Sequence, residues 1–325
     1  MLYPLTFHPL FKERVWGARN LERLYQKNLP PKVPIGESWE ITDRPEGASV
    51  IANGPLAGND LHWLMEHNAG ALLGPARAQG GRFPILVKIL DAGEKLSLQV
   101  HPTARVAAQL GGEPKTEMWY IADARPGAEL YVGLRRGVTR AEFERRIREG
   151  TVADCFHRVR VRPGDVMFLP SGRVHGIGAG IVIFEIQQNS DTTYRVFDWN
   201  RPGLDGKPRE VHVEQSLKCI DFEDFEPALA QGELRTDAGQ AFQSTVLVDD
   251  PLFTVEHVVD RRCSPVITRS SHPEIIGVLE GCLRLQSEKA QLALGPGEFC
   301  LKPASVEAIT LEFPPPLRFL RIRPG

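Results

Sequence analysis

Leu96-Ser97-Leu98-Gln99-Val100-His101-Pro102 is a stretch in which apolar and polar side chains alternate strictly. This period of two is typical of a half-buried strand, with the apolar side chains on one face. The opposite face then carries a hydroxyl, an amide and an imidazole, which are groups that bind ligands. Pro102 has no backbone N–H to donate, so we expect the strand to end there.

Two stretches further along the chain carry polar groups of the same kind. The segment Lys115-Thr116-Glu117-Met118-Trp119-Tyr120 alternates as well and places Glu117 on its polar face. Residues 163–175 indicate a turn, an apolar strand and a second turn that leads to His175. Imidazole, carboxylate and amide groups with one negative charge in total suit a divalent ion such as zinc. The candidate metal ligands are Gln99, His101, Glu117 and His175.

The composition describes a globular protein rather than one built for nucleic acid or for a membrane. The chain has 325 residues, 42% of them hydrophobic, which is enough for one large or two medium domains. Its formal net charge of -2 gives no basic stripe for nucleic acid, and no apolar run approaches the roughly 18 residues of a membrane span. The cysteines are scattered without metal-binding spacing, and the N-terminus lacks the pattern of a signal peptide. We therefore expect a cytoplasmic protein with reduced thiols.

Strands dominate the expected secondary structure, with a few short helices between them. The 26 prolines and 30 glycines are spread along the chain, as in proteins with many short strands joined by turns. Asp60, Thr103 and Thr139 are the expected N-caps of three helices. The expected helices cover residues 59–73, 103–110, 139–150 and 213–220.

Polar and aromatic residues within apolar segments allow two interpretations each. Lys88 interrupts an apolar strand and either marks a sheet edge or directs a cation into the site. Glu185 and Arg195 form either a structural ion pair or part of the site. Trp16 and Trp39 are either core residues or walls of the pocket.

A second, smaller domain is expected after an acidic, loop-rich segment at residues 221–240. We place the first domain, with all candidate ligands, at residues 1–228 and the second at residues 236–325.

The second domain repeats one motif of the first. The sequence Pro-Gly-Asp-Val-Met-Phe-Leu-Pro at residues 163–170 reappears as Pro-Gly-Glu-Phe-Cys-Leu-Lys-Pro at residues 296–303. Five residues after the first copy comes His175, but five residues after the second comes Ala308. We therefore expect the second domain to keep the framework, to lack metal and to pack against the first.

Several motifs together resemble a known family. Residues 164–175 have the pattern G-x5-P-x-G-x2-H, which resembles the second motif of the cupin barrels. Residues 96–102, 115–120 and 187–196 resemble segments of the type I mannose-6-phosphate isomerases, or phosphomannose isomerases, in their short bacterial form. The similarity covers about residues 1–220, with the motifs in the same order. It implies a mainly β protein with two cupin (jelly-roll β-barrel) domains, a few short helices and a degenerate, metal-free second cupin.

The resemblance also implies roles for individual residues. The family's zinc ligands fall on the four candidate ligands above, with one zinc ion per chain. An amide oxygen is a mediocre zinc ligand, so Gln99 either ligates directly or hydrogen-bonds to His101 or water. The implied catalytic residues are Arg195, Lys115 and Glu185, and the implied phosphate-contacting residues are Lys88, Ser97 and Arg201.

The implied reaction is the reversible, zinc-dependent isomerisation of D-mannose 6-phosphate and D-fructose 6-phosphate through an enediol-type proton transfer. Zinc would stabilise developing negative charge as a Lewis acid. Lys115, with a pKa lowered near the ion, and Glu185 are both candidates for the proton carrier. Arg195 keeps its proton, so its implied role is electrostatic. The implied partner is a small sugar phosphate, and we expect a monomer or a homodimer.

Two other functions compete with this one. A cupin that binds sugar or metal without catalysis would not require the extra cations near the ligands. An iron-dependent cupin oxygenase more often has a His-x-His first motif, from which Gln99 departs. An assay of fructose 6-phosphate formation, with and without chelator and oxygen, separates the three hypotheses.

Overall fold

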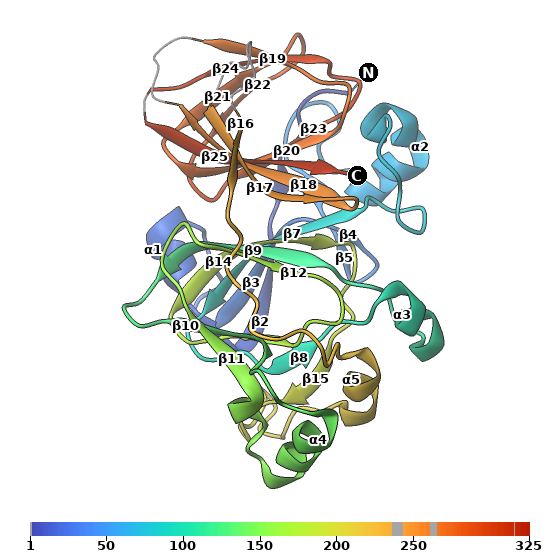
Figure 1. Ribbon diagram of the computed structural model, residues 1–325. Helices are drawn as coiled ribbons and strands as arrows, with labels where there is room; N and C mark the ends of the chain where they lie inside the picture. The colour runs from blue at the N-terminus through green and yellow to red at the C-terminus, as the bar shows by residue number, and fades with distance from the viewer. Residues whose placement is uncertain (1, 236–242, 261–264, 315) are drawn as a thin grey trace.

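The computed structural model describes residues 2–235, 243–260, 265–314 and 316–325. Strands are the main regular secondary structure of these residues and form two stacked pairs of sheets (Figure 1). The predicted mainly β architecture is confirmed. Within the described ranges no helix is long and apolar enough to cross a membrane. The helices are α1 (Asn20–Tyr25), α2 (Leu61–Leu73), α3 (Ala104–Leu110), α4 (Arg140–Glu149) and α5 (Val213–Cys219), with a 3-10 turn at Val152–Cys155.

The first pair of sheets contains the predicted polar stretches. Apolar side chains from both of its sheets, including Trp119 and Leu130, pack into one cluster between them. One sheet has the order β12 (Val166–Leu169), β9 (Glu117–Ala124), β14 (Ile181–Gln188), β7 (Ile85–Ala92), β2 (Leu10–Ala18) and β3 (Ile35–Ile41). The facing sheet has the order β11 (Phe156–Arg160), β10 (Glu129–Leu134), β13 (His175–Ile177), β8 (Leu98–Val100) and β15 (Tyr194–Phe197).

The second pair of sheets encloses a separate apolar cluster, which includes Val278, Leu285 and Phe319. One sheet has the order β16 (Glu233–Arg235), β17 (Gln243–Asp250), β18 (Phe253–Asp260), β25 (Leu317–Pro324), β20 (Glu274–Glu280) and β23 (Phe299–Lys302). The other has the order β19 (Val266–Arg269), β24 (Ala308–Glu312), β21 (Leu283–Gln286) and β22 (Gln291–Leu294). Two small pairings complete the described strands: β1 (Phe7–His8) with β6 (Val50–Ile51), and β4 (Asp43–Arg44) with β5 (Gly47–Ala48).

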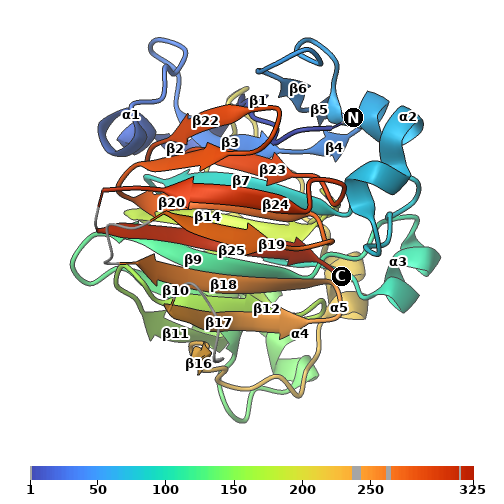
Figure 2. The same cartoon turned by 90° about the horizontal axis from the view of Figure 1, so that it is seen from above.

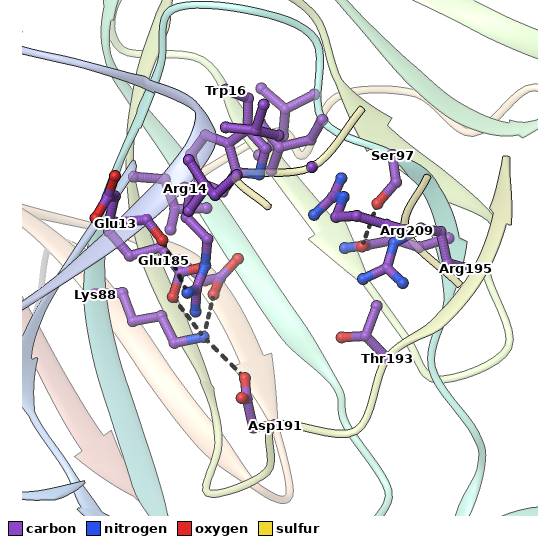
Figure 3. A pocket seen from close by; sticks show the side chains of 18 of the residues that line it. Glu13, Arg14, Trp16, Lys88, Ser97, Glu185, Asp191, Thr193, Arg195 and Arg209 are labelled. Atoms are coloured by element: carbon purple, nitrogen blue, oxygen red, sulfur yellow. Dashed lines mark hydrogen bonds and ion pairs between the residues drawn. The ribbon is translucent and has the colours of Figure 1, made fainter. Parts of the chain in front are cut away.

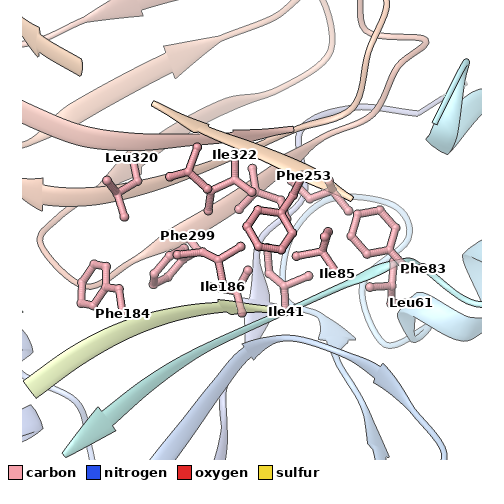
Figure 4. Packing of buried hydrophobic residues seen from close by; sticks show 14 of the residues in the cluster. Ile41, Leu61, Phe83, Ile85, Phe184, Ile186, Phe253, Phe299, Leu320 and Ile322 are labelled. Carbon is pink, nitrogen blue, oxygen red and sulfur yellow. The ribbon is translucent and has the colours of Figure 1, made fainter. Parts of the chain in front are cut away.

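The six-stranded sheet of the first pair is buried on both faces. Figure 2 shows β20, β25 and β18 lying over β7, β14 and β9. On β14, Phe184 and Ile186 point into this interface, where the ring centroids of Phe184 and Phe299 lie 5.4 Å apart (Figure 4). Because side chains alternate along a strand, Glu185 points the other way, into the first sandwich. The second pair of sheets therefore covers the back of the strands that carry the polar groups.

Most local predictions from the sequence are confirmed. The carboxylate of Asp60 and the hydroxyls of Thr103 and Thr139 accept hydrogen bonds from the first turns of α2, α3 and α4. Gly164 and Gly172 both have positive φ, of 94° and 98°, in the turns that flank β12. The N–H of Gly172 donates to the carbonyl of His101, which ties this motif to the first polar stretch.

Candidate functional site

The polar stretch lies inside the five-stranded sheet, with a neighbouring strand on each side. β8 pairs with β13 and with β15, and Gln99 is directly opposite both His175 and Arg195. Directly opposite residues of an antiparallel ladder place their side chains on the same face. Strand pairing thus brings together predicted site residues that are far apart in the sequence.

Three of the four candidate ligands form a compact buried triad. His101 follows β8, Glu117 begins β9 and His175 begins β13. Their potential ligand atoms all lie within 4.8 Å of one another, and each residue is at most 1% exposed. Nε2 of His101 is 3.4 Å from one oxygen of Glu117, and Nε2 of His175 is 3.5 Å from the other.

Hydrogen bonds to the backbone orient both imidazoles of the triad. Nδ1 of His101 is 2.9 Å from the carbonyl of Thr192, and Nδ1 of His175 is 2.9 Å from the carbonyl of Arg173. A carbonyl only accepts, so Nδ1 carries the proton and Nε2 presents a lone pair toward Glu117. Nε2 of His101 and both oxygens of Glu117 have no hydrogen-bond partner among the described residues. Buried acceptors left without donors are unusual, and a shared cation would satisfy all of them.

Gln99 borders the triad but turns its amide nitrogen toward it. Nε2 of Gln99 is 3.3 Å from Nε2 of His175, while its oxygen accepts from the Ser97 hydroxyl at 3.3 Å. The carboxamide must rotate by a half-turn before its oxygen could face a metal, because the amide nitrogen has no lone pair to give. Direct ligation by Gln99 stays a prediction.

Burial and charge set the protonation of the triad. Burial lowers the pKa of His101 and lowers that of His175 to about 3, so both rings are neutral near pH 7. Burial would raise the pKa of Glu117, but the charge of Lys115, whose Nζ is 3.0 Å away, helps hold it well below its usual range. Two neutral imidazoles and one carboxylate are the protonation states that a divalent ion requires.

The protein groups around Lys115 raise its pKa, whereas the sequence-based expectation was a pKa lowered by the nearby ion. Burial alone would lower the pKa of this ammonium group, which is 4% exposed. The negative charges of Glu117, Glu185 and Asp191 outweigh burial and raise the pKa. Lys115 is therefore a cation at neutral pH in this arrangement.

A pocket of about 540 Å³ opens beside the triad. Gln99 and Lys115 line it, and both of them also contact triad residues, so they join the pocket to the candidate metal centre. Trp16 forms part of the wall, whereas Trp39 is 1% exposed and belongs to the core. Of the predicted catalytic and phosphate-contacting residues, the pocket is lined by Lys88, Ser97, Lys115, Glu185 and Arg195.

One end of the pocket carries a cluster with more carboxylates than cations. Nζ of Lys88 is 3.5 Å from Glu185, 3.7 Å from Asp191 and 3.8 Å from Glu37. Arg14 donates from Nε to Glu37 at 2.7 Å, which adds a second cation (Figure 3). Lys88 thus points into the site, as one interpretation predicted, and it lies among three carboxylates there.

Glu185 and Arg195 do not pair with each other within the described part of the chain. Glu185 accepts from the indole N–H of Trp119 at 2.9 Å and faces Lys88. Arg195 donates from Nη1 to the carbonyl of Glu210 at 2.6 Å, and its Nε is buried without a partner. The structural ion pair considered for these two residues is therefore not formed.

The other end of the pocket is positively charged. Figure 3 shows Ser97, Arg195 and Arg209 across the pocket from Lys88. Arg201, predicted as a phosphate contact, is not among the lining residues; it pairs with Asp198 at 2.9 Å.

Comparison with known proteins assigns the chain to a family. Residues 5–134 match the catalytic domain of type I phosphomannose isomerase. The chain is 34% identical over 310 residues to the mannose-6-phosphate isomerase of Streptococcus mutans, which covers 95% of both chains. The chain belongs to the type I phosphomannose isomerases. It is therefore an enzyme, of the aldose–ketose isomerase class.

Other relatives of this phosphomannose isomerase chain agree in sequence and structure. The chain is 42% identical over 220 residues to mannose-6-phosphate isomerase ManA of Bacillus subtilis, covering 67% of this chain and 68% of that relative. The crystal structure of a mannose 6-phosphate isomerase from Bacillus subtilis superimposes with a TM-score of 0.88 at 29% identity, covering 99% of each chain.

Sequence reasoning missed two arginines that line the pocket of this family member. Arg14 follows Lys12 and Glu13 in a segment expected to be irregular, and no pattern distinguishes it from them. Arg209 lies in a loop rich in glycine, proline and charge, where the sequence gives no register. A search for every arginine near the motifs would have found Arg209, but only together with Arg201, which does not line the pocket.

Proposed function

We propose that this phosphomannose isomerase interconverts D-mannose 6-phosphate and D-fructose 6-phosphate with one zinc ion per chain. The observation that carries the proposal is the buried triad, whose unsatisfied acceptors lie next to a pocket with a cationic end. A sugar phosphate offers both groups that such a site needs, namely oxygens for a cation and a dianion for arginines.

The ion would be held by His101, Glu117 and His175, with Gln99 as a fourth ligand after its amide rotates. The three triad residues fit because Nε2 of His101 and both oxygens of Glu117 are buried without a hydrogen-bond partner among the described residues, and Nε2 of His175 also faces Glu117. When bound, zinc supplies Lewis-acid stabilisation of negative charge on the sugar oxygens. The backbone carbonyls behind the two imidazoles keep the rings in the required orientation.

We assign the phosphate group to the arginine end of the pocket. Ser97, Arg195 and Arg209 offer a hydroxyl and two guanidinium groups, which suit phosphate oxygens. Lys88 is engaged with three carboxylates, so we assign it to holding Glu185 rather than to the phosphate. This orientation directs the carbonyl end of the sugar toward Glu185 and Lys115.

Glu185 is our choice for the group that moves the proton between the two carbons. Burial and the charge of Glu117 raise its pKa toward the range in which a carboxylate both accepts and returns a proton. The raised pKa of Lys115 supports a different role, in which this cation donates a hydrogen bond to a sugar oxygen.

We propose that both pairs of sheets are cupin domains, divided as residues 1–228 and 236–325, and that the second is metal-free. The apolar cluster inside the second pair supports this, because Ile309 and Leu311, which follow Ala308 on β24, belong to it. β16 at Glu233–Arg235 adds three residues to the proposed second domain.

Four described cysteines are free thiols, which supports a cytoplasmic enzyme; Cys263 lies outside the described residues.

A coupled assay of fructose 6-phosphate formation from mannose 6-phosphate tests the proposal. Activity should be lost with chelator, return with zinc, and not depend on oxygen. A metal-loaded protein without isomerase activity would leave the non-catalytic cupin hypothesis, and oxygen consumption would favour the oxygenase. Sedimentation of the same preparation decides between monomer and homodimer.

A further inference from the structure

We propose that Asp198 is the positioning residue of the phosphate site, and that it acts by holding Arg209 beside Arg195. This inference rests on the proposed function, because it concerns how the arginine end of the pocket is built. Asp198 does not line the pocket itself, so any effect on ligand binding must pass through a residue that does.

Asp198 grips Arg209 with both carboxylate oxygens. Nε of Arg209 donates to Oδ2 at 2.7 Å, and Nη2 donates to Oδ1 at 2.6 Å. This is the bidentate geometry that fixes a guanidinium plane most firmly. The carboxylate is 5% exposed, so water does not compete strongly for these hydrogen bonds. With this edge occupied, the remaining N–H groups of Arg209 are left for the pocket that it lines.

The backbone around Asp198 supports a built arrangement rather than an accidental contact. Trp199 and Asn200 have φ of 58° and 52°, in the left-handed region that a tryptophan rarely adopts. The indole N–H of Trp199 donates to the carbonyl of Leu96 at 2.7 Å. This hydrogen bond joins the turn after β15 to the polar stretch at residues 96–102, and the turn in this way fixes the position of Asp198.

Electrostatics explains why a carboxylate is needed at this position. Arg195 and Arg209 line the same end of the pocket, and like charges at close range repel. Burial and the charge of Arg209 both lower the pKa of Arg195, and the second of these effects is the repulsion between the two arginines. Asp198 also binds Arg201 at 2.9 Å, so one carboxylate offsets part of the charge of three arginines.

Asp198→Asn tests this role, with inorganic phosphate as the probe in titration calorimetry and in inhibition kinetics. Asparagine keeps the shape of the side chain but places its amide N–H opposite an N–H of Arg209. One of the two hydrogen bonds between residues 198 and 209 is therefore lost. We expect phosphate to bind about tenfold more weakly and KM for mannose 6-phosphate to rise about tenfold. Turnover should change by less than about threefold, and bound metal should be unchanged, because neither depends on how firmly the phosphate group is bound.

A double variant separates positioning from a merely structural role. Adding Asp198→Asn to Arg209→Ala should weaken phosphate binding by less than about twofold more, since the residue through which Asp198 acts is gone. If Asp198→Asn does not fold, Arg209→Lys keeps the charge, removes the bidentate grip and should give the same tenfold loss. The matched control is Glu94→Gln, which removes the exposed acid on the other side of Arg201, 3.7 Å away, and should leave phosphate binding unaltered.

Two results would overturn the inference. One is unchanged phosphate binding in Asp198→Asn, or in Arg209→Lys if only that variant folds. The other is a full additive loss in the double variant. A wild-type chain without isomerase activity would instead contradict the proposed function, and calorimetry with phosphate would still decide the role of Asp198.

Discussion

Replacing Lys88 with methionine distinguishes the two roles that sequence and structure suggest for this residue. The resemblance implies a phosphate contact, whose loss would weaken phosphate binding with little effect on folding. The structure places Nζ of Lys88 within 3.8 Å of Glu37, Glu185 and Asp191, so its loss removes a cation that all three carboxylates share, and leaves them to Arg14 and Lys115. We therefore expect Lys88→Met to act mainly on stability.

The expected loss follows from burial. Lys88 is 3% exposed and Glu185 is 4% exposed, and breaking a buried ion pair by removing one partner costs about 3–5 kcal/mol. Burial would raise the pKa of Glu37, but Lys88, followed by Arg14, lowers it to about 2. A lowered carboxyl pKa stabilises the fold above the pKa of the unfolded chain, about 4.3, and that stabilisation is lost as the pH falls through the folded value. The deficit of Lys88→Met should therefore be largest near pH 7 and shrink below about pH 4.5.

Urea unfolding at several pH values measures this deficit, and Lys12→Met is the matched control. Both lysines lie over the ring of Trp39, with Nζ of Lys12 4.5 Å and Nζ of Lys88 5.1 Å from its centroid, but Lys12 is half-buried and outside the carboxylate cluster. Its loss should cost less than about 1 kcal/mol. The reasoning is refuted if Lys88→Met is as stable as the wild type at pH 7 while phosphate binds about tenfold more weakly.

Three further predictions concern the metal, the reaction and the second pair of sheets. Glu117→Gln removes the only charged ligand of the triad, so metal content and activity should fall together by elemental analysis and assay; retained metal would exclude Glu117 as a ligand. Arg195→Ala should reduce kcat/KM about 10²- to 10³-fold in the coupled assay with bound metal unchanged, whereas Arg201→Ala, outside the pocket, should reduce it less than about tenfold. Phe299→Ala should lower the free energy of unfolding by about 3–5 kcal/mol in urea, because its ring packs on Phe184 behind the site; a change under about 1 kcal/mol would contradict the shared core.

Residues that act through a strand pattern could be located from the sequence. The period of two at residues 96–102 and 115–120 assigned His101 and Glu117 to polar faces, and both are in the triad. Helix caps at Asp60, Thr103 and Thr139 were equally predictable, because capping depends on residues within one turn. Local rules of this kind need no knowledge of the rest of the fold.

Residues that act through loop conformation could not be located in the same way. Arg201 lies six positions after Arg195 and was the natural candidate for the phosphate, yet Arg209 lines the pocket. The left-handed turn at Trp199 and Asn200 redirects the chain between Arg195 and Arg201. No residue propensity predicts this conformation for tryptophan.

The electrostatic environment of a buried charged residue also could not be predicted from the sequence. The expectation for Lys115 considered only an ion that lowers its pKa, and it missed three carboxylates from different segments that converge on this residue and raise the pKa. Such convergence depends on tertiary packing and leaves no local signal. The stacking of the two pairs of sheets through Phe184 and Phe299 likewise depends on contacts more than a hundred residues apart in sequence.

The measurement that tests the central claim most directly is the metal content of the purified enzyme, followed in the same samples as its activity during chelation. The buried triad, with unsatisfied acceptors on His101 and Glu117, should hold one divalent ion per chain, and activity should fall in proportion to the ion removed and return with zinc. Full isomerase activity in a preparation stripped of divalent metal would contradict the account.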